Sequence, residues 1–407
     1  MNGLLDRDAA VFLHQSGSTP VGGAFRAVDG VWVEDADGHR FMDFHGNTCH
    51  NIGYCHPRLI AALKEQLGLL PFTPRGFTNE PSVQLAERLS DLWPYGKGQV
   101  LFGLSGADAI EMALKLAYVA TGRTRTLAFE DSWHGAALGA VWVGGREKER
   151  RGFPRFEGCS HAVPFWPRKA DEDAETTARL SLEDLRRLFA EIGGFACLLA
   201  EPIRSTPHVP PAWYWPEVER LCRDNGTLLI FDEIPTGLGK TGRLFSGEHF
   251  DVAPDMTVLG KSLGGAAVPL AAVIARDGLN VAAHMAIGHY THQKNPLLCR
   301  AGLATLAIIE DEELADRAHR MGVRALAELQ RIAALSRWLV GARGIGLLMA
   351  VEFHSPTEAR AARTACFAAG LNASLSEGRF LTLSPPLTIT EPDLDHALAI
   401  VADAARG

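Results

Sequence analysis

Short apolar runs that stop abruptly at a polar or charged residue recur through the middle of this chain. Three of them are Ala196–Ala200 before Glu201, Leu228–Phe231 before Asp232, and Met256–Leu259 before Gly260 and Lys261. Continuous apolar runs of this length are typical of strands buried on both faces of a parallel sheet. Because the carboxyl ends of parallel strands open onto one edge, we expect Glu201, Asp232 and Lys261 to lie at a common edge. A lysine nucleophile beside a fixed negative charge could be built this way.

The rest of the pattern predicts alternating helices and strands. Alternation around Asp-Gly turns predicts a strand meander over residues 25–44, and helical periodicity follows over 58–68, 81–93 and up to about Thr121. Further strands are expected at 99–103, 126–129 and 270–275, and further helices at 181–190, 215–225 and 297–334. Strands at 347–352 and 379–383 predict a second α/β unit at the C-terminal end. We therefore expect an α/β fold.

The turn Leu104–Ala109 joins a predicted strand to a long amphipathic helix and contains Ser105, Gly106 and Ala107. Small residues at a helix N-terminus leave backbone N–H groups free and favour an anion. The turn has two readings of about equal weight: an anion site, or a helix cap by Ser105 with nothing bound.

Composition narrows the class of partner. The 407 residues are 47 % apolar and 22 % charged, with a formal net charge of −8 and no run of Lys or Arg, which disfavours nucleic acid and favours a small molecule. No apolar stretch approaches the roughly 20 residues needed to span a bilayer, so we expect no membrane contact. Seven scattered cysteines predict reduced thiols, and with no signal peptide apparent we expect a cytoplasmic protein.

The run from Phe231 to Gly242 followed by Gly260-Lys261 resembles the motif of class III aminotransferases, which are pyridoxal phosphate (PLP) enzymes of fold type I. An Asp-Glu pair and a distant lysine mean little alone, but the spacing of Asp232 and Lys261 agrees with that family. The resemblance implies that Asp232 keeps the ring nitrogen of PLP protonated and that Lys261 forms a Schiff base with the cofactor. It implies a large domain with a mostly parallel seven-stranded sheet, and a smaller α/β domain.

The same resemblance predicts the domain boundaries. Residues 1–50 are expected to form an N-terminal segment whose meander packs on the small domain, 51–295 the PLP-binding domain, and 296–407 the C-terminal small domain.

Further motifs assign cofactor contacts by the same resemblance. Ser105, Gly106 and Ala107 map onto the phosphate loop, where Ala107 replaces the family's threonine and leaves the site more dependent on backbone amides. Trp133 and His134, just before Gly135, are expected to contact the cofactor, with Trp133 stacked on one face of the pyridine ring, although Trp133 could instead be plain core.

Ile234 is expected to cover the opposite face of the ring, and Glu201 to join the polar network near Asp232 and the ring hydroxyl. Thr291 precedes Asn295-Pro296 as the family's threonine does, and there it reaches the phosphate of the partner subunit. This implies a homodimer with its active site at the interface.

Two departures concern the substrate. The family's arginine three residues before Pro385-Pro386, which grips a carboxylate, is Thr382 here, and its glutamine after Asp-Glu-Val is Pro235. Both changes resemble a subgroup related to aminoethylphosphonate ammonia-lyases and phosphoamine lyases. Asn47 in the active-site segment 45–57 and Arg75 in the loop 72–79 are further candidate substrate contacts.

Two reactions follow from these motifs. The first hypothesis is an aminotransferase acting on the primary amine of a small amine or amino acid, which family prevalence favours. The second is a lyase that eliminates ammonia or phosphate from a small phosphonate- or phosphate-bearing amine, which the missing arginine favours. Lys261 argues against a non-enzymatic scaffold. We expect no metal, because the three histidines of segment 45–57 lack a recognisable ligand spacing.

Overall fold

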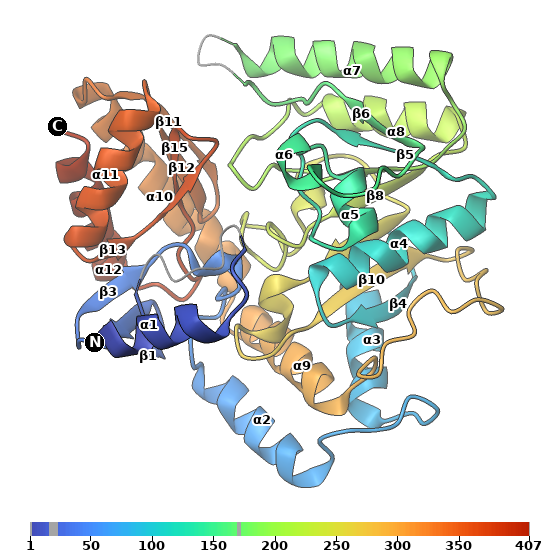
Figure 1. The fold of residues 1–407 in the computed structure, drawn as a ribbon, viewed down its shortest axis with the longest axis horizontal. Helices are drawn as coiled ribbons and strands as arrows, with labels where there is room; N and C mark the ends of the chain where they lie inside the picture. Colours follow the sequence, from blue (N-terminus) through green and yellow to red (C-terminus); the bar gives the residue numbers. More distant parts are fainter. Residues whose placement is uncertain (1, 16–22, 169–171, 407) are drawn as a thin grey trace.

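The structure, a computed structural model, describes residues 2–15, 23–168 and 172–406. Residues 16–22, which belong to the predicted N-terminal segment, and residues 169–171 lie outside this range, as do residues 1 and 407. Figure 1 shows the large central body beside a smaller C-terminal part.

A seven-stranded sheet in the order β4-β10-β9-β8-β7-β5-β6 forms the centre of the large body. Its strands are β4 (Gly98–Gly103), β5 (Arg125–Phe129), β6 (Cys159–Ala162), β7 (Phe195–Ala200), β8 (Leu228–Asp232), β9 (Met256–Leu259) and β10 (Ala271–Arg276). β5 to β9 pair in parallel, whereas β10 runs antiparallel to both of its neighbours, β4 and β9. The predicted mostly parallel seven-stranded sheet of an α/β fold is therefore confirmed.

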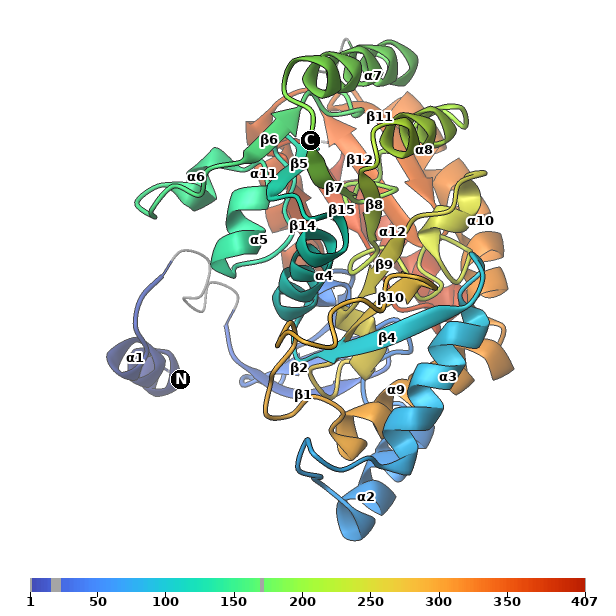
Figure 2. The same ribbon diagram turned by 90° about the vertical axis from the view of Figure 1, so that its right-hand side faces the viewer.

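Helices cover both faces of this sheet (Figure 2). The helices of the large body are α2 (Pro57–Leu69), α3 (Glu80–Leu92), α4 (Gly106–Thr121), α5 (Leu138–Val143), α6 (Glu147–Arg150), α7 (Ala174–Glu191) and α8 (Tyr214–Asp224), of which α2 packs on α9 rather than on the sheet. Along β8, Leu228 and Ile230 join the core cluster that contains α4, whereas Leu229 and Phe231 join the cluster that contains α7 and α8. The two-residue period of a strand thus explains why β8 is apolar throughout: each face packs on its own helices.

Two smaller sheets complete the chain. The first has the order β1-β2-β3-β13, and the second the order β11-β12-β15-β14. Their strands are β1 (Phe25–Asp29), β2 (Trp32–Asp35), β3 (Arg40–Asp43), β11 (Leu339–Ile345), β12 (Leu348–Phe353), β13 (Leu371–Asn372), β14 (Ser374–Ser376) and β15 (Phe380–Leu383). The remaining helices are α1 (Asn2–Val11), α9 (Pro296–Asp311), α10 (Leu314–Leu335), α11 (Pro356–Ala368) and α12 (Glu391–Ala404).

The N-terminal meander is tied to the C-terminal part by backbone pairing, because β13 runs parallel to β3 with Leu371 opposite Met42. α9 packs against α2 and α3, whereas α10 packs against β11 and α12. The packing partners of the chain therefore change between α9 and α10, and the domain boundary at residue 296 stays a prediction.

Two helix boundaries differ from the sequence pattern. The segment 297–334 is broken between α9 and α10, where Glu313 has φ +49°, a left-handed value that ends a helix. α7 begins at Ala174 rather than near Ser181, because Asp173 caps it by accepting a hydrogen bond from the Thr176 N–H.

All seven cysteines are free thiols. No helix in the described part of the chain combines the length and the apolar character that crossing a membrane requires.

Candidate active site

The carboxylate of Asp232, at the end of β8, is held on both oxygens. Oδ2 lies 2.7 Å from Nδ1 of His134, and Oδ1 accepts a hydrogen bond of 3.1 Å from the N–H of Ile234. The side chains of His134 and Asp232 are 0 % and 3 % exposed. A carboxylate accepts and does not donate, so Nδ1 of His134 carries the proton. Asp232 is thus a buried, oriented negative charge, and the partnership with His134 is one that the sequence motifs did not reveal.

Lys261 lies two residues past the last residue of β9 and begins a short 3₁₀ turn over Lys261–Gly264. Its φ of +45° lies in the left-handed region, which a non-glycine residue adopts only when its surroundings enforce it. Its neighbour Gly260 lies against Ile234, where an added Cβ would be 3.3 Å from Cγ2 of that side chain. The backbone at this strand end is therefore closely constrained around the lysine.

A cavity of about 420 Å³ opens beside Lys261. Its lining includes Cys49, Ser105 and Gly106 together with the segment 266–270. The structure thus brings the predicted phosphate loop and the predicted nucleophile to the wall of one cavity.

The start of α4 is closely packed by the other candidate residues. Ser105 caps the helix by accepting a hydrogen bond of 3.1 Å from the Asp108 N–H. A Cβ on Gly106 would lie 2.8 Å from Cδ1 of Ile234, and a Cβ on Gly135, whose φ is +129°, would lie 2.8 Å from Cβ of Ala107. The first N–H groups of an α-helix have no intrahelical acceptor, so this helix start can bind an anion.

Glu201, at the end of β7, has partners on both oxygens. Oε2 accepts a hydrogen bond of 2.7 Å from the Ser205 N–H, and Oε1 lies 3.3 Å from Nη1 of Arg204. Arg204 is 2 % exposed, its Nη2 donates to the Asp131 carbonyl at 2.9 Å, and its guanidinium lies 4.7 Å from the centre of the Trp166 ring. Glu201 is therefore fixed by a buried arginine that the sequence motifs did not single out.

Trp133 follows Asp131, whose φ of +59° turns the chain sharply after β5. The guanidinium of Arg146 lies 5.8 Å from the centre of the Trp133 ring, and Nε of Arg146 donates to the Asp131 carbonyl at 3.2 Å. Two guanidinium groups, from Arg146 and Arg204, thus converge on one carbonyl oxygen beside Trp133.

Three consecutive residues of the segment 45–57 have left-handed backbone: Gly46, Asn47 and Thr48, with φ of +45°, +48° and +58°. Burial lowers the pKa of His45, and the charge of Lys261 lowers it further, whereas Asp43 raises it. Burial raises the pKa of the Cys49 thiol, and Lys261 opposes this shift. This strained turn therefore lies beside the lysine, and the side chain of Asn47 is exposed on it.

Thr382, in β15, is 6 % exposed, and its hydroxyl donates to Oγ of Ser376 at 3.1 Å. Glu377, which follows Ser376 in the chain, lies near Arg204, with Oε1 3.6 Å from Nε of that guanidinium. The C-terminal part thus reaches the Glu201 region through the ion pair of Glu377 with Arg204, and Thr382 offers only a neutral hydroxyl.

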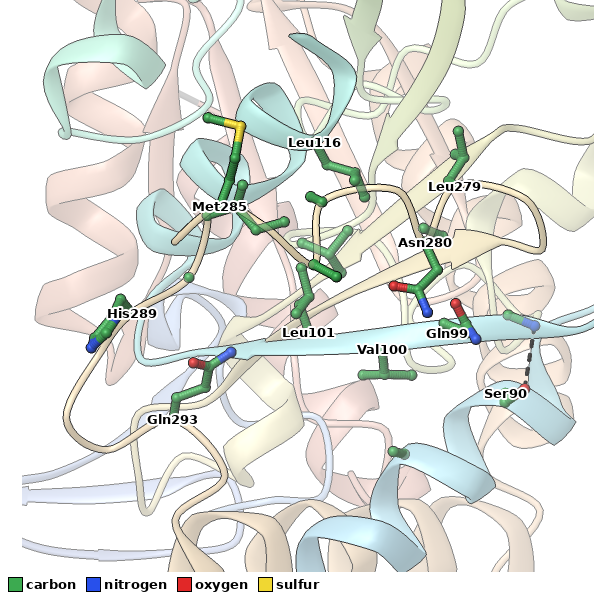
Figure 3. A pocket seen from close by; sticks show the side chains of 18 of the residues that line it. Ser90, Gln99, Val100, Leu101, Leu116, Leu279, Asn280, Met285, His289 and Gln293 are labelled. Atoms are coloured by element: carbon green, nitrogen blue, oxygen red, sulfur yellow. Dashed lines mark hydrogen bonds between the residues drawn. The ribbon is translucent and has the colours of Figure 1, made fainter. Parts of the chain in front are cut away.

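Arg75 and Thr291 are exposed and do not line the cavity beside Lys261. Arg75 lines a separate cavity of about 960 Å³ between β4, α3 and the loop 279–293. Figure 3 shows Leu101 and Val100 on opposite faces of β4, and Met285, His289 and Gln293 on the loop beside this strand. Within one chain, the structure does not bring Arg75 or Thr291 to the lysine, so both assignments stay predictions about an assembled protein.

The described residues fit a flat, phosphate-bearing ring. A helix start suited to an anion, a buried carboxylate and an amine beside a cavity are the groups that PLP requires, and the fold is the PLP-dependent fold type I. Residues 14–405 match the aminotransferase class-III family, and this chain belongs to it. It is an enzyme whose cofactor is PLP.

Relatives within the family differ in activity. The chain is 36 % identical to the (R)-1-hydroxy-2-aminoethylphosphonate ammonia-lyase of Vibrio splendidus, over 98 % of this chain and 89 % of that protein. It is 33 % identical to the acetylornithine aminotransferase of Methanopyrus kandleri, over 93 % of each. The PLP-bound structure of an amine transaminase from an uncultivated Pseudomonas species matches 98 % of this chain and 99 % of its own, with a TM-score of 0.90 and 28 % identity.

Proposed function

We propose that this enzyme acts on a small primary amine that also carries a phosphonate or phosphate group and, on the carbon next to the one bearing the amine, a hydroxyl group, as in a 1-hydroxy-2-aminoethylphosphonate. The hydroxyl leaves as water, one water is taken up, and the products are ammonia and an aldehyde. One observation carries the proposal: the position at which the family's carboxylate-gripping arginine is expected holds Thr382, whose hydroxyl is committed to Ser376. A hydroxyl cannot replace the bidentate, charge-assisted contact that a guanidinium makes with a carboxylate.

The absence of an arginine at position 382 matters most for the second half of a transamination. A transaminase must bind an amino donor and an amino acceptor in turn, and in this family one of them is commonly glutamate or its keto acid. A lyase needs no second substrate. The similarity to the Vibrio splendidus ammonia-lyase over nearly the whole chain supports the same choice.

The roles proposed for the residues follow from their positions. PLP, when bound, supplies a protonated ring that accepts the electron pair released at the carbon bearing the amine. Asp232 keeps that ring protonated by ion pairing, and His134 orients Asp232. Lys261 binds the cofactor and then serves as the general base at the same carbon.

The remaining contacts are proposed in the same way. Ser105, Gly106 and Ala107 hold the phosphate, Trp133 and Ile234 cover the two faces of the ring, and Glu201 joins the polar network near Asp232 and the ring hydroxyl. Asn47, exposed on its strained turn beside Lys261, is a candidate contact to the substrate.

Transamination is the second candidate, and specific observations favour it. Every group proposed to hold PLP also serves an aminotransferase, and the Methanopyrus kandleri relative is named as one. The two candidates differ only in what happens to the amino group.

The experiment that separates them supplies candidate amines without any keto acid and measures ammonia and the cofactor spectrum together. We expect many equivalents of ammonia per active site from a phosphonate-bearing amine. Conversion of one equivalent of cofactor to its amine form, with turnover only after a keto acid is added, would instead establish transamination.

The assembly proposed is a homodimer. Five large apolar side chains are exposed within α2 and the loop after it: Leu67, Leu69, Leu70, Phe72 and Phe77. Such a density is typical of a surface that another chain covers. Helix α1, which stands away from the body in Figure 2, exposes Leu4, Leu5 and Val11 as well. A second copy on this side would also give Thr291 a partner site to reach.

The compartment proposed is the cytoplasm. Its support is the set of seven free cysteines, since unpaired thiols in this number are usual where the environment is reducing.

A further inference from the structure

Arg146 stands out among the charged groups near Trp133 because its terminal nitrogens are unused. Its Nε is anchored on the Asp131 carbonyl, but among the residues that the structure describes, Nη1 and Nη2 have no hydrogen-bond partner and no carboxylate lies within 4 Å of them. The side chain is half-buried. A half-buried guanidinium that is anchored at one nitrogen and open at the other two is pre-organised to bind an anion.

The acidic groups of this region are already engaged by other cations. Glu201 and Glu377 lie against Arg204, and Glu377 also lies 3.4 Å from Nε2 of His208. Arg343 and Arg379 both pair with a third carboxylate, that of Glu352. Of the four arginines in this region, the only one that lacks a close counter-ion among the described residues is therefore Arg146; the other three are Arg204, Arg343 and Arg379.

The electrostatic surroundings agree with this picture. Burial lowers the pKa of Arg146, and the neighbouring guanidinium of Arg204 lowers it further, whereas Glu201, Glu149 and Glu377 raise it. Arg146 is thus within electrostatic reach of Glu201 and Arg204, at the same end of the site as Trp133. An anion bound there would relieve the repulsion between the two arginines.

We propose that Arg146 is a specificity-determining residue that binds the phosphonate or phosphate dianion of the substrate. The positive charge of the neighbouring Arg204 attracts the same anion. This rests on the proposed function, since it assigns the anionic group of the same substrate. Arg146 lies beside Trp133 in the large body, whereas Thr382 lies in the C-terminal sheet. The charge that binds the anion would therefore come from the large body rather than from the position of the family's arginine. Arg204 is a positioning residue, because its guanidinium already holds Glu201.

The test measures binding of ethylphosphonate, which has the anion but no amine, to the PLP-loaded enzyme by calorimetry. We expect Arg146→Gln to weaken binding about 10- to 100-fold, the range for losing a hydrogen bond to a charged group. Arg146→Lys should recover part of the loss, because it restores the charge without the planar fork. Lys148→Gln, which removes one positive charge from the short helix α6 that Arg146 precedes, should bind as the unaltered enzyme does.

Three results would overturn the proposal. They are no binding of ethylphosphonate to the unaltered enzyme, equal binding by Arg146→Gln, and loss of PLP from Arg146→Gln after dialysis, which would make Arg146 a contact of the cofactor. Circular dichroism of each variant separates a binding defect from misfolding.

A parallel ammonia assay keeps this proposal distinct from the proposed reaction. If ethylphosphonate binding depends on Arg146 but no amine yields ammonia, the anion site stands and the lyase fails. If ammonia is released with the same KM by the unaltered enzyme and by Arg146→Gln, the lyase stands and the anion site fails.

Discussion

Nδ1 of His134 lies 2.7 Å from Oδ2 of Asp232, and both side chains are buried, so the carboxylate at the end of β8 is oriented by a residue that follows β5. Strands β5 and β8 are separated in the sheet by β7, which is followed by Glu201. The contact therefore spans the carboxyl edge above β7 and links two of the groups proposed to hold the cofactor.

This relationship gives the first prediction. Asp232→Asn removes the buried negative charge and should lower the rate on the order of 100-fold or more, since breaking a buried charge pair costs about 3 kcal/mol or more. His134→Gln keeps Asp232 charged but loosens it, and should cost roughly tenfold. Steady-state rates and PLP affinity by equilibrium dialysis would be measured together. An Asp232→Asn enzyme with the rate of the unaltered enzyme would contradict the assigned role.

The second prediction concerns Lys261. Borohydride reduction of the PLP-loaded enzyme should fix the cofactor on the peptide that contains Lys261, and Lys261→Ala should yield no labelled lysine. The structure gives a physical reason to exclude Lys240, whose buried Nζ donates to the Pro385 carbonyl at 2.7 Å. Mass spectrometry of the digested protein decides the matter, and recovery of the label on Lys240 or Lys294 would refute the assignment.

The third prediction concerns the phosphate loop. Gly135→Ala places a Cβ 2.8 Å from Cβ of Ala107 at a φ of +129°, so it should displace the start of α4 and weaken PLP binding about tenfold or more. Gly96→Ala is the matched control, because its φ is +106° but nothing lies within 4 Å of the added atom. Both variants carry backbone strain, so only a difference between their PLP affinities tests the packing argument. Equal affinities would count against it.

Sequence reasoning succeeded where a local pattern carries the information. The apolar runs that end at Glu201, Asp232 and Lys261 are strands β7, β8 and β9, because a strand covered on both faces must be apolar throughout. The small residues before α4 likewise predicted a helix start.

The remainder depends on contacts between distant segments. Arg204 and Arg146 look like ordinary surface charges in the sequence, and only the left-handed turn at Asp131 brings both to one carbonyl. The pairing of β13 with β3 joins residues more than 300 positions apart, beyond the reach of any local pattern. For the ion pair between Glu201 and Arg204, the one signal in the sequence was that Arg204 follows Glu201 by three residues.

The fourth prediction concerns stability and pH. Burial lowers the pKa of Lys240 from 10.5 to about 7. Between about pH 7 and pH 10.5 the unfolded chain therefore binds more protons at this residue than the folded chain, so its contribution to stability rises with pH in that window. Lys240→Met lacks the titration and should lose that part of the slope.

Urea unfolding at pH 7 and pH 10 would measure it. The quantity to compare is the unfolding free energy of Lys240→Met minus that of the unaltered enzyme. This difference should be larger at pH 7 than at pH 10 by more than roughly 1.4 kcal/mol, the equivalent of one pKa unit. An unchanged difference between the two pH values would show that the folded chain keeps Lys240 charged.

The last prediction concerns the proposed sharing of active sites between two chains. Thr291 is exposed and does not line the cavity beside Lys261 in its own chain, so the role proposed for it at the phosphate is on a second copy. Lys261→Ala and Thr291→Ala should each be impaired as homodimers. In a mixed dimer, one of the two sites would combine the intact Lys261 of one chain with the intact Thr291 of the other. Mixing the two variants under conditions of proven chain exchange should therefore restore activity, approaching one good site in each mixed dimer.

Thr291→Ser, which keeps the hydroxyl, is the matched control and should need no complementation. Failure of the mixed dimers to regain activity, with exchange demonstrated by mass spectrometry, would place the contribution of Thr291 within its own chain or remove it from the site.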